Sequence, residues 1–314
     1  MKIGIIMDSI EDITIEKDTT FALMLEAQAR EHEIFYIEPD GVWLQDDLIW
    51  GRMSAIEVTD DAEDWYALDE EIVQPLIELD VVLMRKDPPF DMGYIYLTYL
   101  LEQAESRGLH VINKPQSLRD ANEKFYTAWF PECCPKTLVT SDMLLLRDFL
   151  LEEERIVVKP LDSMAGGSVF YLEQGDTNTN VILETITEQG TTMVMAQHFI
   201  PEIKKGGDKR ILMIYGEPIP YALARIPAKD DFRGNLARDA EPEGRELTDR
   251  DRWICEQVGP TLLQKGLYFV GIDVIGDYLT EINVTSPTGV RELENFFDIN
   301  ICGEFFDRLE QDIQ

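Results

Sequence analysis

Residues 266–285 constrain the fold most, because their apolar residues alternate as in the two strands of a β-hairpin. Residues that pair across two antiparallel strands share one face of the sheet. Pairing the two apolar sets places Ile272 opposite Ile282, and Asp273 then lies opposite Glu281. The segment therefore predicts a hairpin with one apolar face and one face that carries carboxylates.

The turn of this hairpin decides whether the two carboxylates meet. A loop of three residues, Gly276 to Tyr278, keeps Asp273 and Glu281 on one face. A two-residue turn at Gly276-Asp277 would put them on opposite faces. We therefore predict a three-residue or bulged turn.

The same face of the hairpin also carries Asn283, which gives three oxygen-bearing side chains on one surface. Mg²⁺ prefers hard oxygen ligands, keeps several waters and commonly shares its shell with substrate phosphates. Asp273, Glu281 and Asn283 are therefore candidate ligands for Mg²⁺, with Mn²⁺ as the alternative ion. In a chain with 61 acidic residues, solvated acids at a sheet edge are the competing interpretation.

Length and charge limit the classes of protein to consider. The 314 residues, 45% of them hydrophobic, allow two or three domains. The net charge of −33 speaks against a nucleic-acid partner, because nucleic-acid binding requires a basic surface. No apolar run reaches the roughly 18 residues that span a membrane, and the first residues are typical of a strand rather than a signal peptide. The four cysteines lack zinc-ligand spacing, so we expect reduced thiols in a cytoplasmic protein.

The first part of the chain alternates strands and helices, which predicts an α/β layer with a mainly parallel sheet. The expected strands are 3–7, 34–37, 81–84 and 110–112, and the expected helices are 19–31 and 94–107. A boundary is predicted at Asn113-Lys114-Pro115, followed by a helix over 121–130.

The second part is typical of an α+β region with antiparallel strands. The expected strands are 156–159, 168–172, 193–197, 210–215 and 218–224, and the expected helices are 142–153, 180–189 and 248–265. Residues 226–246 are polar and interrupted by Pro and Gly, which predicts a functional lid or a disordered segment.

A turn rich in small residues follows the strand that ends on Lys159. Gly166 and Gly167 lie in this turn, where small residues let backbone N–H groups approach phosphate. The turn lacks the spacing of a Walker loop or a Rossmann fingerprint. Lys159 could alternatively extend its ammonium group to solvent along an apolar surface.

The order of these parts resembles the ATP-grasp superfamily and, within it, the bacterial glutathione synthetase family. The resemblance covers nearly the whole chain and rests on eight strings, which are Met84–Asp91, Asn113–Asp120, Asn122–Lys124, Ala196-Gln197, Gly207–Arg210, Ala224–Pro227, Arg233–Leu236 and Thr280–Thr288. Two departures concern glycine: Ser163 and Ala165 replace glycines usual in the phosphate turn, and the lid after Asn235 is poorer in glycine and more charged.

The resemblance implies a Rossmann-like (pre-ATP-grasp) domain at 1–120 and an ATP-grasp fold at 121–314. The ATP-grasp fold would divide into 121–200 and 201–314, with the lid at 226–246 and the nucleotide in a cleft between two sheets. The implied reaction joins γ-glutamylcysteine to glycine through an acyl phosphate and releases glutathione, ADP and phosphate. The family also implies a homo-oligomer, either a dimer or a tetramer.

The resemblance further implies a role for each candidate site residue. Arg210 and Arg225 would steady the reacting carboxylate. Lys124 and Lys159 would bind the phosphates, and Gly166-Gly167 would cover them. The remaining nucleotide contacts would come from Gln197, His198, Phe199, Ile200 and Asp208, and the substrate contacts from Arg233, Asn235, Ser286 and Arg291.

Alternatives to this interpretation are kept open. Arg210 and Arg225 could be cross-strand partners of surface acids, and Arg85 and Lys86 could bind substrate or be solvated. At the level of function, the rivals are another ATP-grasp carboxylate–amine ligase and a protein that binds ATP without catalysis.

Overall fold

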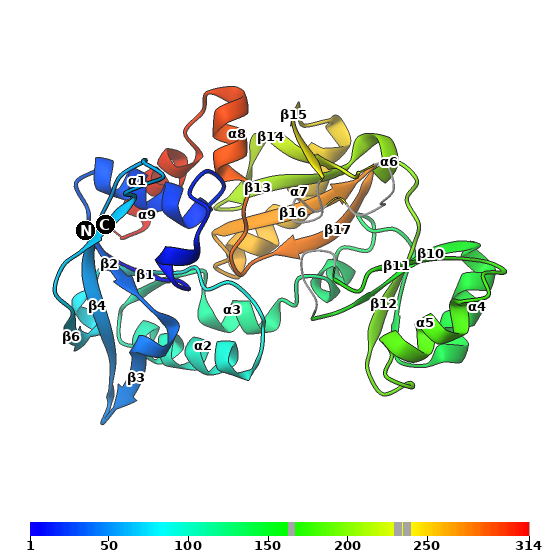
Figure 1. Ribbon diagram of the computed structural model, residues 1–314, viewed down its shortest axis with the longest axis horizontal. Coiled ribbons are helices and arrows are strands. Elements are labelled where there is room, and N and C mark those ends of the chain that lie inside the picture. Colours follow the sequence, from blue (N-terminus) through cyan, green and yellow to red (C-terminus); the bar gives the residue numbers. More distant parts are fainter. Residues whose placement is uncertain (163–166, 229–233, 235–239, 314) are drawn as a thin grey trace.

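The computed structural model describes residues 1–162, 167–228, 234 and 240–313. The described residues form three sheets, with the N-terminal sheet at one end of the molecule and a separate lobe at the other (Figure 1). The expected combination of α/β and α+β parts is confirmed. Among the described residues no helix is long and apolar enough to cross a membrane.

The N-terminal sheet has eight strands, of which six follow the order β3-β4-β2-β1-β7-β8. Strands β1, β2, β7 and β8 are parallel as expected, and β4 adds an antiparallel edge to which β5 and β6 also pair. Helices α1 and α2 pack against alternating residues, Ile5 on one face and Ile6 on the other. The bounds of the strands are β1 Lys2–Ile6, β2 Glu33–Ile37, β3 Val42–Gln45, β4 Leu48–Val58, β5 Tyr66–Leu68, β6 Ile72–Pro75, β7 Val81–Met84 and β8 His110–Ile112. The helices are α1 Thr19–Ala29 and α2 Met92–Glu105, and 3-10 turns span Ile10–Asp12, Pro39–Gly41 and Leu76–Glu78.

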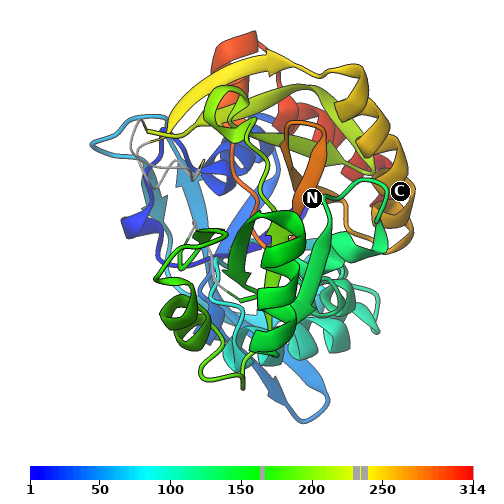
Figure 2. The ribbon, with the colours of Figure 1, turned by 90° about the vertical axis from the view of Figure 1, so that its right-hand side faces the viewer.

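The second sheet has four antiparallel strands in the order β11-β10-β12-β9 and forms the lobe that faces the viewer in Figure 2. Its strands are β9 Thr137–Thr140, β10 Arg155–Pro160, β11 Phe170–Glu173 and β12 Val194–His198. Helices α4 Met143–Glu153 and α5 Thr179–Ile186 cover it, and Leu146, Ile156 and Leu183 lie in its fully buried core. The lobe thus has a hydrophobic core of its own.

The third sheet has five antiparallel strands in the order β15-β14-β13-β16-β17. Its strands are β13 Asp208–Ile214, β14 Glu217–Ile226, β15 Glu241–Glu246, β16 Phe269–Ile275 and β17 Tyr278–Asn283. The short helix α6 Ile203–Gly206 precedes β13, and the long helix α7 Asp249–Gln264 packs on one face. Thr248 and Asp251 form a capping box at the start of α7.

Two predicted elements were wrong. The helix expected over 121–130 is instead α3 at Pro115–Asp120, followed by a 3-10 helix at Phe125–Trp129. Proline is favoured in the first turn of a helix, and the Asn122 carboxamide then accepts hydrogen bonds from Lys124 N and Phe125 N, which turns the chain. In the expected lid, residues 241–246 are the edge strand β15 paired with β14. The lid residues 229–233 and 235–239 lie outside the described residues.

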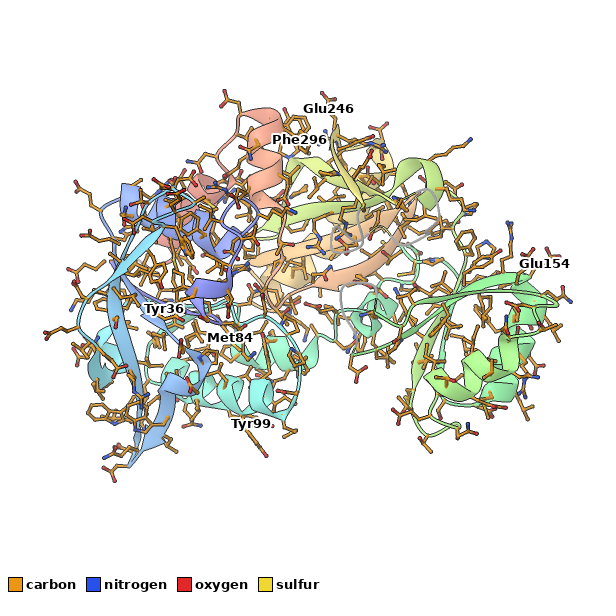
Figure 3. The ribbon with its side chains drawn as sticks, viewed as in Figure 1. Tyr36, Met84, Tyr99, Glu154, Glu246 and Phe296 are labelled. Carbon is orange, nitrogen blue, oxygen red and sulfur yellow. The ribbon has the colours of Figure 1, made fainter. Side chains whose placement is uncertain are left out.

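The last two helices, which the sequence analysis did not assign, return the chain to the N-terminal sheet. Helices α8 Val290–Phe297 and α9 Ile301–Ile313 pack against α1, and one hydrophobic core contains Phe21 of α1 together with Phe305 and Phe306 of α9. The two termini therefore lie close together (Figure 1). Phe296 lies on the solvent side of α8, near Glu246 of β15 (Figure 3).

The turn between β13 and β14 contacts α7 without any intervening side chain. A Cβ added at Gly259 would stand 2.1 Å from Gly216 O, so Gly259→Ala must push α7 away from the sheet. We expect a loss of about 1–3 kcal/mol in the free energy of unfolding, measured by urea denaturation. Gly206→Ala is the control, because a Cβ there meets nothing within 4 Å. Equal stability of the two variants would contradict this packing.

Candidate functional site

The hairpin of β16 and β17 has the predicted pairing but not the predicted loop. Ile272 pairs with Ile282 and Asp273 with Glu281, as expected. The turn, however, is the two-residue Gly276-Asp277, because Ile275 pairs with Tyr278. The odd residue enters as a bulge at Thr280, between the pairs Val274–Leu279 and Asp273–Glu281. The bulge restores the parity that the turn would otherwise break.

Strand register brings the polar side chains of four strands to one face of the sheet. Asp208 pairs with Arg225, and Arg210 of the same strand pairs with Asp273. Because Asp273 in turn pairs with Glu281, a polar row runs across β13, β16 and β17, and the Asp208–Arg225 pair lies two residues along on the same face. The alternate residues form the apolar face that packs on α7.

Asp273 is the centre of a buried ion-pair cluster. Its Oδ1 accepts from Arg210 Nε at 2.5 Å and its Oδ2 from Arg210 Nη2 at 3.0 Å. Arg225 Nη2 lies 3.0 Å from Asp273 Oδ2 and 2.6 Å from Asp208 Oδ2. The Asn283 amide Nδ2 also donates to Asp273 Oδ2, at 3.1 Å. This geometry favours the functional interpretation of both arginines, since neither is a surface ion-pair partner.

The two aspartates of the cluster have pKa values displaced in opposite directions. Burial would raise the pKa of Asp273, but the guanidinium groups of Arg210 and Arg225 outweigh burial and hold it well below its usual range. Burial raises the pKa of Asp208 to about 7, assisted by the charge of Asp273 and opposed by Arg225. Asp208 Oδ1 is buried and has no hydrogen-bond partner among the described residues. Asp208 can therefore accept a further donor.

Two lysines from the first half of the ATP-grasp-like region converge on Glu281. Lys159 Nζ lies 3.6 Å and Lys124 Nζ 3.9 Å from Glu281 Oε1. Lys159 also donates to the carbonyl of Thr280 at 3.1 Å, which uses an oxygen of the bulge. Burial lowers the pKa of Lys159, opposed by Glu281 and assisted by the nearby Lys124. Lys159 is 6% exposed, so the solvated alternative for this side chain is excluded.

The net charge of the site is therefore positive, opposite in sign to the net charge of the whole chain. Four cationic side chains surround three carboxylates, and the set consists of Lys124, Lys159, Arg210 and Arg225 with Asp208, Asp273 and Glu281. An excess of buried positive charge suits an anionic ligand such as a polyphosphate. The oxygens of Glu281 and Asn283 beside this cluster fit a hard divalent cation.

The candidate adenine-binding segment connects the second and third sheets. The N–H groups of His198 and Phe199 donate to Lys136 O and Arg155 O, so both are already used. The His198 ring bonds to Glu153, and the Gln197 amide donates to Thr137 Oγ1. Ile200 N makes no hydrogen bond within the described residues, and its side chain lies against Gly276 of the hairpin turn. Ile200 is thus the residue of this segment best placed to donate to a purine nitrogen.

Some candidate residues lie elsewhere or cannot be placed. Arg291 bonds to Asp60 of the N-terminal part at 2.8 Å, away from the cluster. Ser286 lies in the loop after β17, and Gly167 is described at the end of the phosphate turn. Gly166, Arg233 and Asn235 lie outside the described residues.

One lid residue can be placed against the cluster. A Cβ added at Gly234 would stand 2.6 Å from Asp208 Cβ and 2.8 Å from Arg225 O. The backbone at Gly234 therefore lies directly against these two residues.

Three polar side chains near the site make contacts that the sequence did not predict, and the solvated alternative for one of them, Arg85, is excluded because it is buried. Asn113 donates to Phe269 O and Val284 O and accepts from Tyr268 N and Phe269 N, so it pins both strands of the hairpin. Buried Arg85 donates to Pro287 O at 3.0 Å. Glu123 accepts hydrogen bonds from the strand end after Asn283. Most of their partners are backbone atoms, so the only signal for these contacts was the place of the three residues in the sequence strings that carry the resemblance.

Comparison with known proteins gives matches along nearly the whole chain. The model of the prokaryotic glutathione synthetase N-terminal domain matches residues 1–119, and that of the prokaryotic glutathione synthetase ATP-grasp domain matches residues 123–298. A glutathione synthetase of Coxiella burnetii is 62% identical over 99% of this chain and 96% of its own length. One of Pseudomonas aeruginosa is 52% identical over 98% of this chain and 97% of its own length.

Two solved structures show the same fold at much lower sequence identity. The D-cycloserine synthetase DcsG superposes with a TM-score of 0.68 at 14% identity and covers 100% of both chains. The structure of the ATP-grasp ligase PsnB with a minimal precursor, Mg and ADP gives a TM-score of 0.64 at 17% identity, over 99% of this chain and 98% of PsnB. The expected ATP-grasp fold is thereby confirmed.

The Arg210 side chain packs directly against Gly271 on its way to Asp273. A Cβ added at Gly271 would stand 2.7 Å from Arg210 Cδ and 3.1 Å from Pro287 Cβ. We expect Gly271→Ala to destabilise the fold and to cost much less in an Arg210→Ala background, where the first clash is gone. A double-mutant cycle by urea denaturation should give a coupling of about 1 kcal/mol or more. Additive effects would show that Arg210 does not depend on this gap.

Proposed function

Because the chain belongs to the prokaryotic glutathione synthetase family, we propose that its buried cation cluster serves the ATP-dependent joining of γ-glutamylcysteine to glycine. The chain is an ATP-grasp ligase of the glutathione synthetase type. The observation that carries the proposal is the row in which Arg210, Asp273 and Glu281 pair across the sheet beneath two buried lysines. Such a row can bind a polyphosphate and a carboxylate at one place.

The proposed reaction has two steps. In the first, the cysteinyl carboxylate attacks the γ-phosphorus of ATP, the bond to the bridging oxygen breaks, and ADP leaves. In the second, the amine of glycine attacks the acyl carbon, the bond from that carbon to the phosphate oxygen breaks, and the amine loses a proton. The products are glutathione, ADP and phosphate.

The buried positions of Arg210 and Arg225 support a role in the first step. Carboxylate and triphosphate repel each other, so positive charge must neutralise both before they can align. Two unit charges 4 Å apart interact by about 4 kcal/mol at an effective dielectric constant near 20. Arg210 and Arg225 are held by Asp273 and Asp208, which fixes the guanidinium groups before substrate binds. We therefore assign them to the reacting carboxylate and its acyl phosphate.

We assign the nucleotide to the two lysines and to the segment 197–200 at the end of β12. Lys124 and Lys159 would bind its phosphates, and the turn that includes Gly166 and Gly167 would cover them. Ile200 N would donate to adenine, with Gln197, His198 and Phe199 forming the wall of the nucleotide site. The free Oδ1 of Asp208 would accept a donor from the nucleotide or the substrate.

The family uses ATP with a divalent metal, and we propose Mg²⁺ here, with Mn²⁺ as the alternative ion. Glu281 and Asn283 would hold it, with Asp273 beside them because both Asp273 oxygens accept from guanidinium groups. The ion would neutralise phosphate charge.

The lid and the substrate contacts are proposals of the same kind. An acyl phosphate hydrolyses in water, so a cover over the site has a chemical purpose. The contact of Gly234 with Asp208 and Arg225 supports a lid at 226–240. Arg233 and Asn235 would close over the substrate, and Ser286 would contact the peptide or glycine. Arg291 would act from the N-terminal side, where it now bonds to Asp60.

We also propose a cytoplasmic homo-oligomer that takes small-molecule substrates only. Cys133, Cys134, Cys255 and Cys302 are free thiols, which suits a reducing compartment. Size-exclusion chromatography with light scattering would measure the assembly.

The reaction itself is tested by an assay that couples ADP release to absorbance. We expect ADP formation only when γ-glutamylcysteine, glycine and ATP are all present, with one glutathione formed for each ADP. Turnover with a different acid and amine, but not with this pair, would assign the chain to another carboxylate–amine ligation. Protection from thermal unfolding by Mg-ATP without any ADP release would indicate ATP binding without catalysis.

The metal assignment is tested by Glu281→Gln. Loss of one charged ligand next to the phosphates should lower kcat at least about 100-fold while the fold is kept. Glu217→Gln, an exposed position on the same sheet, is the matched control and should leave kcat unchanged. Near-normal turnover in Glu281→Gln would refute the assignment.

A further inference from the structure

Glu123 makes an unusual set of contacts beside the site. Its carboxylate oxygen Oε1 accepts three hydrogen bonds, from Val284 N at 2.9 Å, Thr285 N at 3.1 Å and Thr285 Oγ1 at 2.9 Å. Its main-chain carbonyl accepts a fourth, from Ile282 N at 2.8 Å. Glu123 thus lies along the edge of β17 and continues the hydrogen bonding of that strand past its last residue, Asn283.

These contacts lie between two groups of functional residues. Asn283, which we assign to the metal, directly precedes the pinned amides, and Ser286 directly follows them. The next residue after Glu123 is Lys124, whose ammonium group approaches Glu281. The Glu123 side chain therefore sets the distance between the end of β17, which lies beside the proposed phosphate-binding lysines, and the loop that follows this strand.

The loop after Thr285 is held from its other end as well. Arg85 donates to Pro287 O at 3.0 Å, and Arg210 Nη1 donates to Thr288 O at 3.2 Å. Glu123 and Thr285 also line a small cavity together with Leu161 and Asp162, the residues just before the phosphate turn. A displacement of Thr285 would therefore also displace the residues before the phosphate turn and the loop carbonyl that Arg210 contacts.

We propose that Glu123 is a positioning residue for the ligation reaction, which fixes the metal-binding end of β17 relative to the substrate loop 285–288. This inference rests on the proposed function. In this role Glu123 acts on the ligands only through its bonds to Val284 and Thr285. Misplacement of reacting groups by about 1 Å can cost on the order of 100-fold in rate without loss of binding.

The test compares two substitutions of the same residue. Glu123→Ala removes the acceptor of all three donors, and we expect kcat to fall about 100-fold while KM for ATP changes less than about threefold. Glu123→Gln keeps an oxygen at the same place and should retain kcat within about fivefold of the wild-type value. Thr285→Val removes one of the three donors and should lower kcat about 3- to 10-fold.

Glu294 provides a matched control for general structural effects. Its Oε1 accepts hydrogen bonds from Ile301 N at 2.8 Å and Cys302 N at 3.2 Å, so it is the same kind of anchor, but its bonds hold the start of α9 and not the hairpin. Glu294→Ala should lower the thermal unfolding midpoint as Glu123→Ala does, but leave kcat of the folded enzyme unchanged.

The outcomes separate this inference from the proposed function. A wild-type protein that forms no glutathione would refute the function. An active wild type with equal kcat in Glu123→Ala and Glu294→Ala, or with Gln as damaging as Ala, would overturn the positioning role. If Glu123→Ala does not fold, an unchanged kcat in Thr285→Val or a collapsed kcat in Glu123→Gln would overturn it equally.

Discussion

The bidentate ion pair between Arg210 and Asp273 is the interaction on which the site depends. Both side chains are almost fully buried, and taking two charges out of water costs several kcal/mol unless each finds close partners. Arg225, Asp208 and Asn283 provide those partners, so the cluster persists only as a set. A pair of apolar residues would fill this space with similar stability. The presence of charges here therefore points to chemistry rather than to folding.

The hairpin shows what residue parity can predict and what it cannot. Alternation of apolar residues was sufficient to place Asp273 opposite Glu281, because any other register would expose Ile272 or Ile282. Counting residues also showed that one extra residue was needed in the loop or beside it. The location of the extra residue at Thr280 depends on tertiary contacts. The Thr280 hydroxyl donates a hydrogen bond to Asp273 O, and the Thr280 carbonyl accepts one from Lys159 Nζ. The contact with Lys159 joins residues 121 positions apart in the chain, and no local pattern encodes it.

The elements that were wrong or unassigned depend on long-range contacts in the same way. Strand β15 reads Glu-Pro-Glu-Gly-Arg-Glu, which has no apolar alternation, and pairs because it lies along β14 and against α8. A Cβ at Gly244 would stand 2.7 Å from the Phe297 ring, so the strand fits only through a glycine. The contacts of Glu123 could not be predicted for a related reason, because they join it to Val284 and Thr285, more than 150 positions later in the chain. The strings that carried the resemblance located the catalytic region, whereas the register of the strands showed which side chains face one another.

The strong acidity of the chain is compatible with an anion site because exposed and buried charges act over different ranges. At physiological ionic strength, exposed charges are screened beyond about 8 Å, so most of the 61 acidic residues have little effect on a ligand inside the site. The buried lysines and arginines are screened much less, and each is held by a specific carboxylate or carbonyl. The local balance of four cations against three carboxylates, and not the net charge of −33, therefore determines the electrostatic environment of the proposed site. A further anion, such as a triphosphate, shifts this balance toward negative charge. A divalent cation bound beside Glu281 would then be needed to bring the loaded site close to neutrality.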